Sequence, residues 1–419
     1  MIRILETSLP LSCFRKKSFL LIHFRNLGQC TIISLDQRDI PELIDRVNSS
    51  ETKKIAVIVH LRRCAEVLSK LDATIPVLAV CGGTDLNEDV HNVEYLKLMT
   101  KSVHRSRAVI VFTRSMLTRF QEFWDLLSLQ PYFTCDWVFC VGPIPIFSKP
   151  SAQRGKIVGG LFLDLRKTGT KVVDVHTNGL QTGTIFTYFT QVSAKSVNVN
   201  LELAYRDLET HVDWLTKRLG CELTRYFLIV GRLRPVKDPQ FALQPFIEWN
   251  SKPVTVLNQK TDEQLSRPYH HHLVYIGSVE EDTNQIRAFL ASMKNSPHIH
   301  HIQSIDQDRL HSLMVASDGL INCSLSEGQS LTIMEAMLLG VPVIARRNSG
   351  NCDLIENDTT GLLFTTPMEL KTCLTRLICE QGLRKKLTTG ARYWIRQPQY
   401  RRNYQIKEYD DIFSTLLKP

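Results

Sequence analysis

The sequence predicts an α/β protein of two domains, each built around a parallel β-sheet, and three observations support this prediction. The chain has 419 residues, which is long for a single hydrophobic core and typical of two domains of ordinary size. Residues 30–120 alternate short β-branched runs with segments of helical spacing. A second alternation of the same kind begins at residue 226. Such a rhythm is typical of parallel strands joined by crossover helices.

Residues 1–215 are expected to form the first domain. Its candidate strands are the short apolar runs Thr31–Leu35, Ile55–His60, Val77–Cys81 and Ala108–Thr113. Helical spacing is found at Pro41–Asn48 and Cys64–Leu71. The rhythm breaks over residues 123–170, which we interpret as an insertion. It returns at residues 171–179, the expected last strand of this domain.

Residues 216–400 are expected to form the second domain, which opens with the strand Tyr226–Val230. Further strands are predicted at Val254–Leu257, Leu273–Ile276 and Gly319–Asn322. Residues 401–419 predict a final helix with one apolar face. That face consists of Ile406, Tyr409, Ile412, Phe413 and Leu416.

Composition excludes several classes of protein. A hydrophobic content of 43% and a charged content of 22% are typical of a soluble globular protein. The net charge of +9 is distributed along the chain without aromatic interleaving, so no nucleic-acid partner is expected. The apolar run Phe19–Ile22 is too short for a signal-peptide core or a membrane span. Eleven scattered cysteines indicate reduced thiols, and we expect a cytoplasmic protein without a transmembrane segment.

A pair of glutamates eight positions apart is the strongest indication of function. Residues 316–340 read as strand, loop and helix, with Glu327 in the loop and Glu335 about one turn inside the helix. The turn Gly328–Ser330 leaves the first N–H groups of that helix unpaired, and these groups with the helix dipole form a phosphate site. A carboxylate on either side suits a diphosphate ligand with hydroxyls at both ends, such as a nucleotide-sugar. A core helix with a solvated carboxylate is the alternative, which the pair and the turn together disfavour.

Two cations form a second candidate group. Arg232 and Lys237 flank the loop after the first strand of the second domain, where open α/β sheets bind ligands. Fixed cations there would stabilise the charge that grows on a departing diphosphate. Arg234 lies two positions further along and is a rival for the arginine role. A solvated basic loop is the alternative for each cation taken alone.

The segment Ser326–Met337 resembles the signature of the retaining glycosyltransferases of family 4, in which seven residues separate two glutamates. Further matches to the family pattern follow in order at Gly231–Pro239, Gly340–Ala345, Gly350-Asn351 and Gly361–Phe364. This resemblance implies the GT-B fold, with two Rossmann-like domains whose parallel sheets face each other across a cleft. It also implies that the final helix, 401–419, crosses back to the first domain.

The same resemblance implies an activity and a set of roles. The enzyme would transfer a hexosyl or related group from a nucleotide-diphosphate sugar to an acceptor that the sequence does not identify. Glu335 would hold the ribose hydroxyls, Glu327 would contact the donor sugar, and Arg232 and Lys237 would serve catalysis. Donor binding would also involve Gly328, Ser330, Leu331 and Arg234. In this family retention is attributed to same-face attack, without a metal or another cofactor.

Four residues of the first domain are candidates for the acceptor side. Gly82, Gly83 and Asp85 follow an apolar strand, and His60 follows another, so all four are expected at the cleft. Residues 82–89 resemble a narrower group within the same family. Asp85 could bind a sugar hydroxyl or the acceptor, and it could equally cap the next helix.

Two features that suggest a metal are interpreted differently. Asp306-Gln307-Asp308 resembles a metal-binding triplet but precedes a helical segment, where Asp is favoured at the cap. The histidines at 270–272 and 300–301 lack a cysteine or carboxylate at ligand spacing, and we expect them to be exposed at strand ends. No metal site is therefore predicted.

One departure from the family pattern bears on activity. Met1–Leu5 is the expected first strand, but Glu6–Ser18 contains no glycine, and without glycine a backbone cannot easily approach a substrate. A nucleotide-sugar-binding protein of the same fold that has lost transfer is therefore the alternative function. Another GT-B activity, such as nucleotide-sugar epimerisation, is a weaker one.

Overall fold

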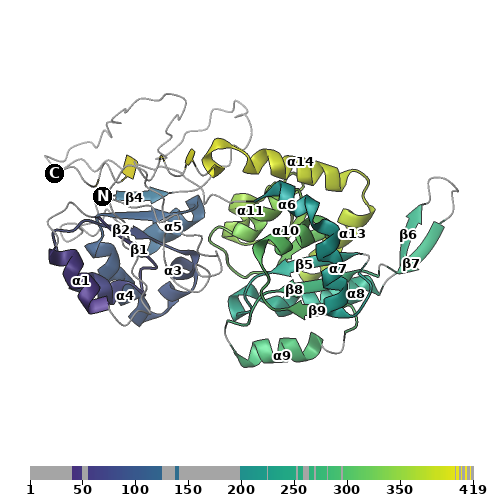
Figure 1. The fold of residues 1–419 in the computed structure, drawn as a ribbon, viewed down its shortest axis with the longest axis horizontal. Helices are drawn as coiled ribbons and strands as arrows, with labels where there is room; N and C mark the ends of the chain where they lie inside the picture. The colour runs from purple at the N-terminus through teal and green to yellow at the C-terminus, as the bar shows by residue number, and fades with distance from the viewer. Residues whose placement is uncertain are drawn as a thin grey trace, which may run out of the picture.

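The computed structural model describes residues 40–49, 55–124, 137–140 and 199–401, apart from short gaps, and isolated positions after residue 401. Two α/β units lie side by side, each around its own parallel sheet (Figure 1). The predicted strands at 1–5, 31–35 and 171–179, the loop at 6–18 and most of the insertion at 123–170 fall outside the described residues.

The first sheet has the strand order β1-β2-β3-β4, with every pair parallel. Its strands are β1 (Ala56–Val59), β2 (Val77–Val80), β3 (Ala108–Val111) and β4 (Trp137–Cys140). β2 and β3 are buried along their whole length because they are apolar on both faces, as in parallel sheets covered by helices. The helices of this unit are α1 (Ile40–Ser49), α2 (Ala65–Lys70), α3 (Gly83–Asn87), α4 (Val93–Arg105) and α5 (Arg114–Phe123).

The second sheet has the order β12-β11-β10-β5-β8-β9 and is also parallel throughout. Its strands are β5 (Tyr226–Val230), β8 (His272–Ile276), β9 (Ile299–Ile302), β10 (Gly319–Asn322), β11 (Val343–Arg346) and β12 (Leu362–Phe364). Neighbouring residues of one strand enter different cores: Leu228 lies in the core on one face, and Phe227 in the core on the other.

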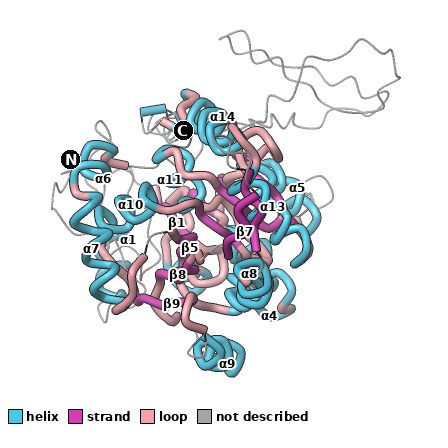
Figure 2. Tube along the Cα trace, turned by 90° about the vertical axis from the view of Figure 1, so that its right-hand side faces the viewer, coloured by secondary structure: helices cyan, strands magenta, loops and turns pink. Residues whose placement is uncertain are grey.

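Helices cover both faces of this sheet. One face packs against α6 (Leu201–Arg206), α7 (Leu208–Leu219), α10 (Gln307–Ala316) and α11 (Leu331–Leu339). The other packs against α8 (Leu243–Asn250), α9 (Asn284–Met293) and α13 (Pro367–Cys379). Figure 2 shows α7 and α10 on one side of β5, β8 and β9, with α8 and α13 on the other. α12 (Ser349–Leu354) and α14 (Leu383–Ile395) complete the unit.

The strand predicted at Val254–Leu257 is present but lies outside the large sheet. As β6 (Pro253–Leu257) it pairs antiparallel with β7 (Gln264–Pro268), in a hairpin that projects from the second unit (Figure 1). It could not join β5, because β8 and β10 already occupy both edges of that strand.

Packing places α6 and α7 with the second sheet, although residues up to 215 were expected in the first domain. Ala204 and Leu215 are buried in the core beneath that sheet, and both helices pack against α10. This stretch is mostly polar, so the narrow apolar face that makes these contacts is not evident from the sequence. Judged by packing, the second unit therefore begins at or before Leu201.

The carboxyl-terminal residues return to the first unit. Ile412 and Leu416 are buried in its core, and the Arg107 guanidinium donates a hydrogen bond of 3.2 Å to the Leu416 carbonyl. α14 runs along the second unit before this crossing (Figure 1). The apolar face expected for residues 401–419 thus contributes at least two side chains to the first core.

Candidate active site

The site predicted from the sequence lies where the strand order of the second sheet reverses, between β5 and β10. From β5 the chain adds β8 and β9 on one side, and then β10, β11 and β12 on the other. β5 and β10 are therefore neighbouring strands after which the chain continues to opposite sides of the sheet. Ligands of open α/β sheets bind at the carboxyl ends of such strands. The loop after β5 contains Lys237, and the loop after β10 contains Glu327.

Glu327 is the centre of a buried polar group. Its Oε1 accepts hydrogen bonds from Lys237 Nζ at 2.5 Å, Ser324 Oγ at 2.7 Å and Asn322 Nδ2 at 3.1 Å. The side chain is only 10% exposed. No described residue donates a hydrogen bond to Oε2, so this oxygen is available to a ligand.

The surroundings keep this carboxylate ionised. Burial by itself would raise the pKa of Glu327, but the adjacent Lys237 charge and the hydrogen bonds from Lys237, Ser324 and Asn322 outweigh burial and lower it. A buried carboxylate paired in this way is a fixed negative charge at neutral pH.

Two further contacts hold the loops together. The Leu325 N–H donates to the Val236 carbonyl at 2.9 Å, joining the loop after β10 to the short 3₁₀ turn η3 (Pro235–Lys237). Asp238 follows that turn with a φ of 40° and pairs with Arg346 on β11 at 2.6 Å. The position of Lys237 is thus set by backbone and ion-pair contacts on both sides.

The two arginines of this loop pair with acidic residues. Arg232 forms an ion pair with Glu280, while Arg234 lies 3.8 Å from both Glu280 and Glu88. Glu88 belongs to the first unit, so Arg234 links the two units. The structure brings Lys237 to Glu327 and holds both arginines beside carboxylates.

α11 begins beside this group, as predicted. Ser330 is its N-cap residue, and its side chain caps no N–H group of the described residues. The positive end of the helix dipole therefore lies next to the Gly328–Ser330 turn. Leu331, the first helical residue, has an exposed side chain.

Glu335 is buried on α11 and held from α10. Its Oε1 accepts a hydrogen bond of 3.1 Å from Gln307 Nε2 and lies 3.9 Å from His311 Nε2. Asp306, in front of Gln307, accepts a hydrogen bond from the Arg309 N–H at 2.8 Å and caps α10. This confirms that the 306–308 triplet starts a helix.

The first unit contacts the Glu327 loop through glycine. A Cβ placed on Gly83 would lie 2.8 Å from the Gly328 nitrogen and 2.9 Å from its Cα. A hydrogen bond from Ser115 on α5 to Asp353 on α12 adds a second contact between the units. Gly83 is thus a position where the backbones of the two units approach closely.

Asp85 and His60 lie beneath this contact. Asp85 is fully buried, and its Oδ2 accepts a hydrogen bond from the Gly82 N–H at 2.8 Å, as the capping alternative expects. The same oxygen lies 3.6 Å from His60 Nδ1, whereas Oδ1 is buried without a partner among the described residues. His60 adopts a φ of 71° just after β1 and remains partly exposed.

Sequence reasoning missed the residues that support the glutamates. Asn322 and Ser324 bind Glu327, and Asn351 Nδ2 in turn donates to Asn322 Oδ1 at 3.2 Å. Asn322 ends β10, and a polar residue at the carboxyl end of a buried strand was the available signal. Gln307 and His311 gave no comparable signal, because they contact Glu335 across 28 and 24 residues of sequence.

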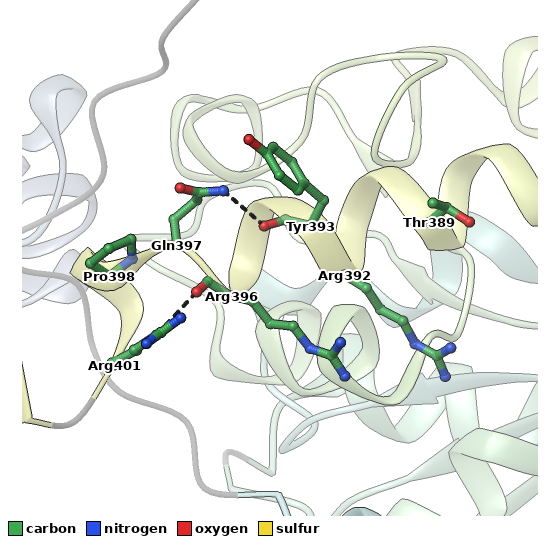
Figure 3. Close-up of a pocket in the computed structure, with 7 residues that line it drawn as sticks. All are labelled: Thr389, Arg392, Tyr393, Arg396, Gln397, Pro398 and Arg401. Atoms are coloured by element: carbon green, nitrogen blue, oxygen red, sulfur yellow. Dashed lines mark hydrogen bonds between the residues drawn. The ribbon is translucent and has the colours of Figure 1, made fainter.

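A hollow of about 550 Å³ lies elsewhere, on α14 (Figure 3). Arginines 392, 396 and 401 are among the residues that line it. Arg392 donates to the Leu339 carbonyl at 2.7 Å, at the carboxyl end of α11. The hollow is therefore at the opposite end of α11 from Ser330 and is distinct from the candidate active site.

Comparison with protein families decides the class of the second unit. Residues 221–394 match the family model described as glycosyl transferases group 1. This part of the chain is therefore similar to the group 1 glycosyltransferase domain. The match spans both glutamates and the Lys237 loop, which is the region where the sequence resembled family 4.

Similarity to individual proteins extends further. Glycosyltransferase 1 domain-containing protein 1 of Xenopus tropicalis is 26% identical over 376 residues, covering 89% of this chain and 84% of the relative. This confirms the narrower resemblance expected from residues 82–89. D-inositol 3-phosphate glycosyltransferase of Acidothermus cellulolyticus is 28% identical over 182 residues, which cover 42% of this chain and 38% of the relative.

Solved structures show the fold. Anabaena HepE in complex with UDP and glucose has a TM-score of 0.59 at 13% identity, covering 90% of this chain and 81% of that one. Sucrose-phosphate synthase from Thermosynechococcus elongatus has a TM-score of 0.57 at 13% identity, covering 93% and 82%. The predicted GT-B fold with two parallel sheets is thereby confirmed. Within the described part of the chain, no helix combines the length and apolarity needed to cross a membrane.

Proposed function

We propose that the chain is a retaining glycosyltransferase that transfers a hexosyl or related group from a nucleotide-diphosphate sugar to an acceptor. The observation that carries this proposal is the Lys237–Glu327 pair at the junction of β5 and β10, beside the start of α11. The group 1 family match and the structural similarity to HepE, whose structure contains UDP and glucose, support a nucleotide-sugar as the donor.

The donor would lie along the start of α11. The diphosphate would meet the N–H groups at Ser330 and Leu331, where the helix dipole favours an anion. Glu327 Oε2, which accepts no hydrogen bond from the described residues, would accept one from a sugar hydroxyl. Glu335, buried and held by Gln307, would bind the ribose hydroxyls.

Lys237 would act on the departing diphosphate. As the bond between the anomeric carbon and the diphosphate oxygen breaks, its electron pair stays on that oxygen, and the Lys237 ammonium stabilises the growing charge. The acceptor oxygen would attack the same face of the sugar, and its proton would pass to the departing phosphate. Arg232 and Arg234 would contribute charge once phosphate displaces the carboxylates of Glu280 and Glu88.

The acceptor would approach from the first unit. His60 and Asp85 lie beneath the Gly82-Gly83 turn that touches Gly328. Asp85 Oδ1 has no partner among the described residues, which favours a polar role for this pair. The proposal includes no metal or other cofactor for transfer, and the expected cytoplasmic location stays a prediction.

A donor panel tests the proposal. Purified full-length chain is incubated with UDP-, GDP- and ADP-sugars, and NMR follows release of the sugar and the anomer formed first. We expect one donor to be hydrolysed slowly to the sugar with the donor's anomeric configuration. Formation of the opposite anomer would exclude retention, and binding without hydrolysis or transfer would favour the alternative, a nucleotide-sugar-binding protein that has lost catalysis. Conversion of the donor into a different nucleotide-sugar would instead favour epimerisation.

A further inference from the structure

A cluster of histidines and one cysteine lies at the edge of the second sheet opposite the candidate active site. His272 is the first residue of β8, and His300 lies near the start of β9. Cys221 follows the end of α7, just before β5. Some fifty residues of sequence separate the cysteine from the nearer of these histidines, so the grouping arises only in the fold.

The three side chains point toward a common centre. His272 Nδ1 lies 2.8 Å from His300 Nε2, and Cys221 Sγ lies 3.8 Å from that same nitrogen. One possible ligand atom from each residue falls within 4.8 Å of the other two. The rings of His272 and His300 stack with their centres 5.1 Å apart.

Burial corrects the expectation of exposure for His271 and His272, whereas His270 is exposed as expected and His300 and His301 are intermediate. His271 and His272 are only 1% and 8% exposed, and Cys221 and His300 are partly buried. Burial, together with the neighbouring imidazoles, lowers the pKa of His272 to about 4.

A second observation indicates an unsatisfied site. His298 packs edge-on against His272, with ring centres 5.1 Å apart, and its Nδ1 is buried without a hydrogen-bond partner among the described residues. Buried polar atoms in native proteins are nearly always paired with protein, water or an ion. His298 therefore adds an unsatisfied polar atom directly beside the three clustered side chains.

We propose that Cys221, His272 and His300 bind a zinc-class transition-metal ion. One thiolate and two imidazoles form a ligand set that zinc prefers, with solvent in the fourth position of a tetrahedron. On binding, the Cys221 thiol releases its proton to solvent. Of His272 Nδ1 and His300 Nε2, the nitrogen that carries the proton of their hydrogen bond gives it up, and the other nitrogen of the same ring takes a proton, so that both facing nitrogens can bind the ion. Zn–N bonds of about 2.0–2.1 Å require these nitrogens to separate by roughly 0.5 Å more, a change that small ring rotations supply.

The ion would link separate elements of the second unit. It would tie the connection between α7 and β5 to the amino ends of β8 and β9. From His272 to the carboxyl end of β8 at Ile276 the distance is about 13 Å, at roughly 3.3 Å per residue. The candidate active site lies at the carboxyl ends of the strands, so the ion would not touch the donor. This proposal is independent of the proposed glycosyl transfer.

Metal binding by the full-length chain tests it. The purified protein is stripped with chelator, dialysed and titrated with Co²⁺ and Zn²⁺. We expect one high-affinity ion per chain, a thiolate-to-cobalt charge-transfer band and the intense visible bands of tetrahedral Co²⁺. Zinc should also raise the melting temperature.

Variants separate this site from incidental binding. Cys221→Ser should abolish the charge-transfer band, and His300→Ala should weaken zinc binding by more than about tenfold. Cys379→Ser, which alters an exposed cysteine outside the cluster, should bind as wild type does. Absence of a stoichiometric ion, or a charge-transfer band that persists in Cys221→Ser, would overturn the proposal. Because Cys221→Ser retains both histidines, it also tests the site if His300→Ala fails to fold.

Discussion

At the scale of single residues, the sequence identified the charged groups of the candidate site but not their partners. The spacing of Glu327 and Glu335 and the position of Lys237 after a strand were sufficient to single them out. The contacts that fix them come from Asn322, Ser324 and Gln307, two of which lie in other elements than the glutamate they bind. Asn322 and Ser324 are close to Glu327 in sequence, whereas Gln307 is 28 residues from Glu335, and that pairing depends on how α10 and α11 pack, which a local pattern does not encode.

The buried Glu327 carboxylate makes stability depend on pH. Its pKa in the folded state is lower than the ordinary value of 4.5, so its stabilising contribution is complete above that value and is lost as the pH falls through the folded pKa. We expect the free energy of unfolding of the wild type to decrease more steeply with acidification than that of Glu327→Gln. Urea titrations between neutral and acid pH measure this difference, and parallel curves would contradict the assigned pairing.

Lys237 should matter more for turnover than for donor binding. Its charge acts mainly on the departing diphosphate, so Lys237→Ala should lower kcat by about 10²-fold, the usual effect of removing one such contact. Donor affinity, measured by calorimetry, should change less. Lys371→Ala removes a comparable ion pair, with Glu248 between α13 and α8, and should leave turnover unchanged. Equal losses in affinity and kcat for Lys237→Ala would indicate a simple binding contact.

At the scale of elements, apolar runs predicted strands well where both faces of the strand are buried. β2, β3, β8 and β10 lie within or close to their predicted ranges because a parallel sheet covered by helices demands such runs. β6 forms a hairpin and α6 joins the second unit because edge availability and long-range packing decided their positions. Neither property is visible in a short window of sequence.

The Gly82-Gly83 turn offers a matched pair of substitutions at the contact between units. In Gly83→Ala the new Cβ would lie 2.8 Å from the Gly328 backbone, so the units must separate. In Gly82→Ala the nearest atom is a His60 ring carbon at an ordinary 3.4 Å. Overpacking at this position would destabilise the contact between the units by about 1–3 kcal/mol. We therefore expect donor turnover to fall tenfold or more in Gly83→Ala, but not in Gly82→Ala. Small-angle scattering should show a larger radius of gyration for Gly83→Ala than for Gly82→Ala. Equal turnover and equal radii of gyration in the two variants would argue against this contact.

At the scale of the whole molecule, length and rhythm predicted two α/β units, and family resemblance supplied the GT-B arrangement. The return of the chain to the first core through Ile412 and Leu416 follows the apolar face of residues 401–419. The boundary between units was less predictable, because α6 and α7 are polar on the outside and bury only a narrow face.

Transfer should not require a divalent metal. Lys237 and the helix dipole of α11 supply the positive charge that a metal would otherwise provide. Activity measured well below the melting temperature should therefore survive excess chelator, even if chelator lowers the melting temperature by removing an ion from the Cys221 cluster. Loss of transfer in chelator that manganese or magnesium restores, while wild-type melting behaviour is retained, would contradict this prediction.

The central claim is that Glu327 and Glu335, on either side of the start of α11, bind a nucleotide-sugar. Calorimetric titration of the wild type and of Glu335→Ala with the donor identified in the panel tests this claim most directly, with circular dichroism to confirm that both are folded. The account predicts measurable donor affinity in the wild type and no detectable binding in a folded Glu335→Ala. Wild-type affinity in that folded variant would contradict it.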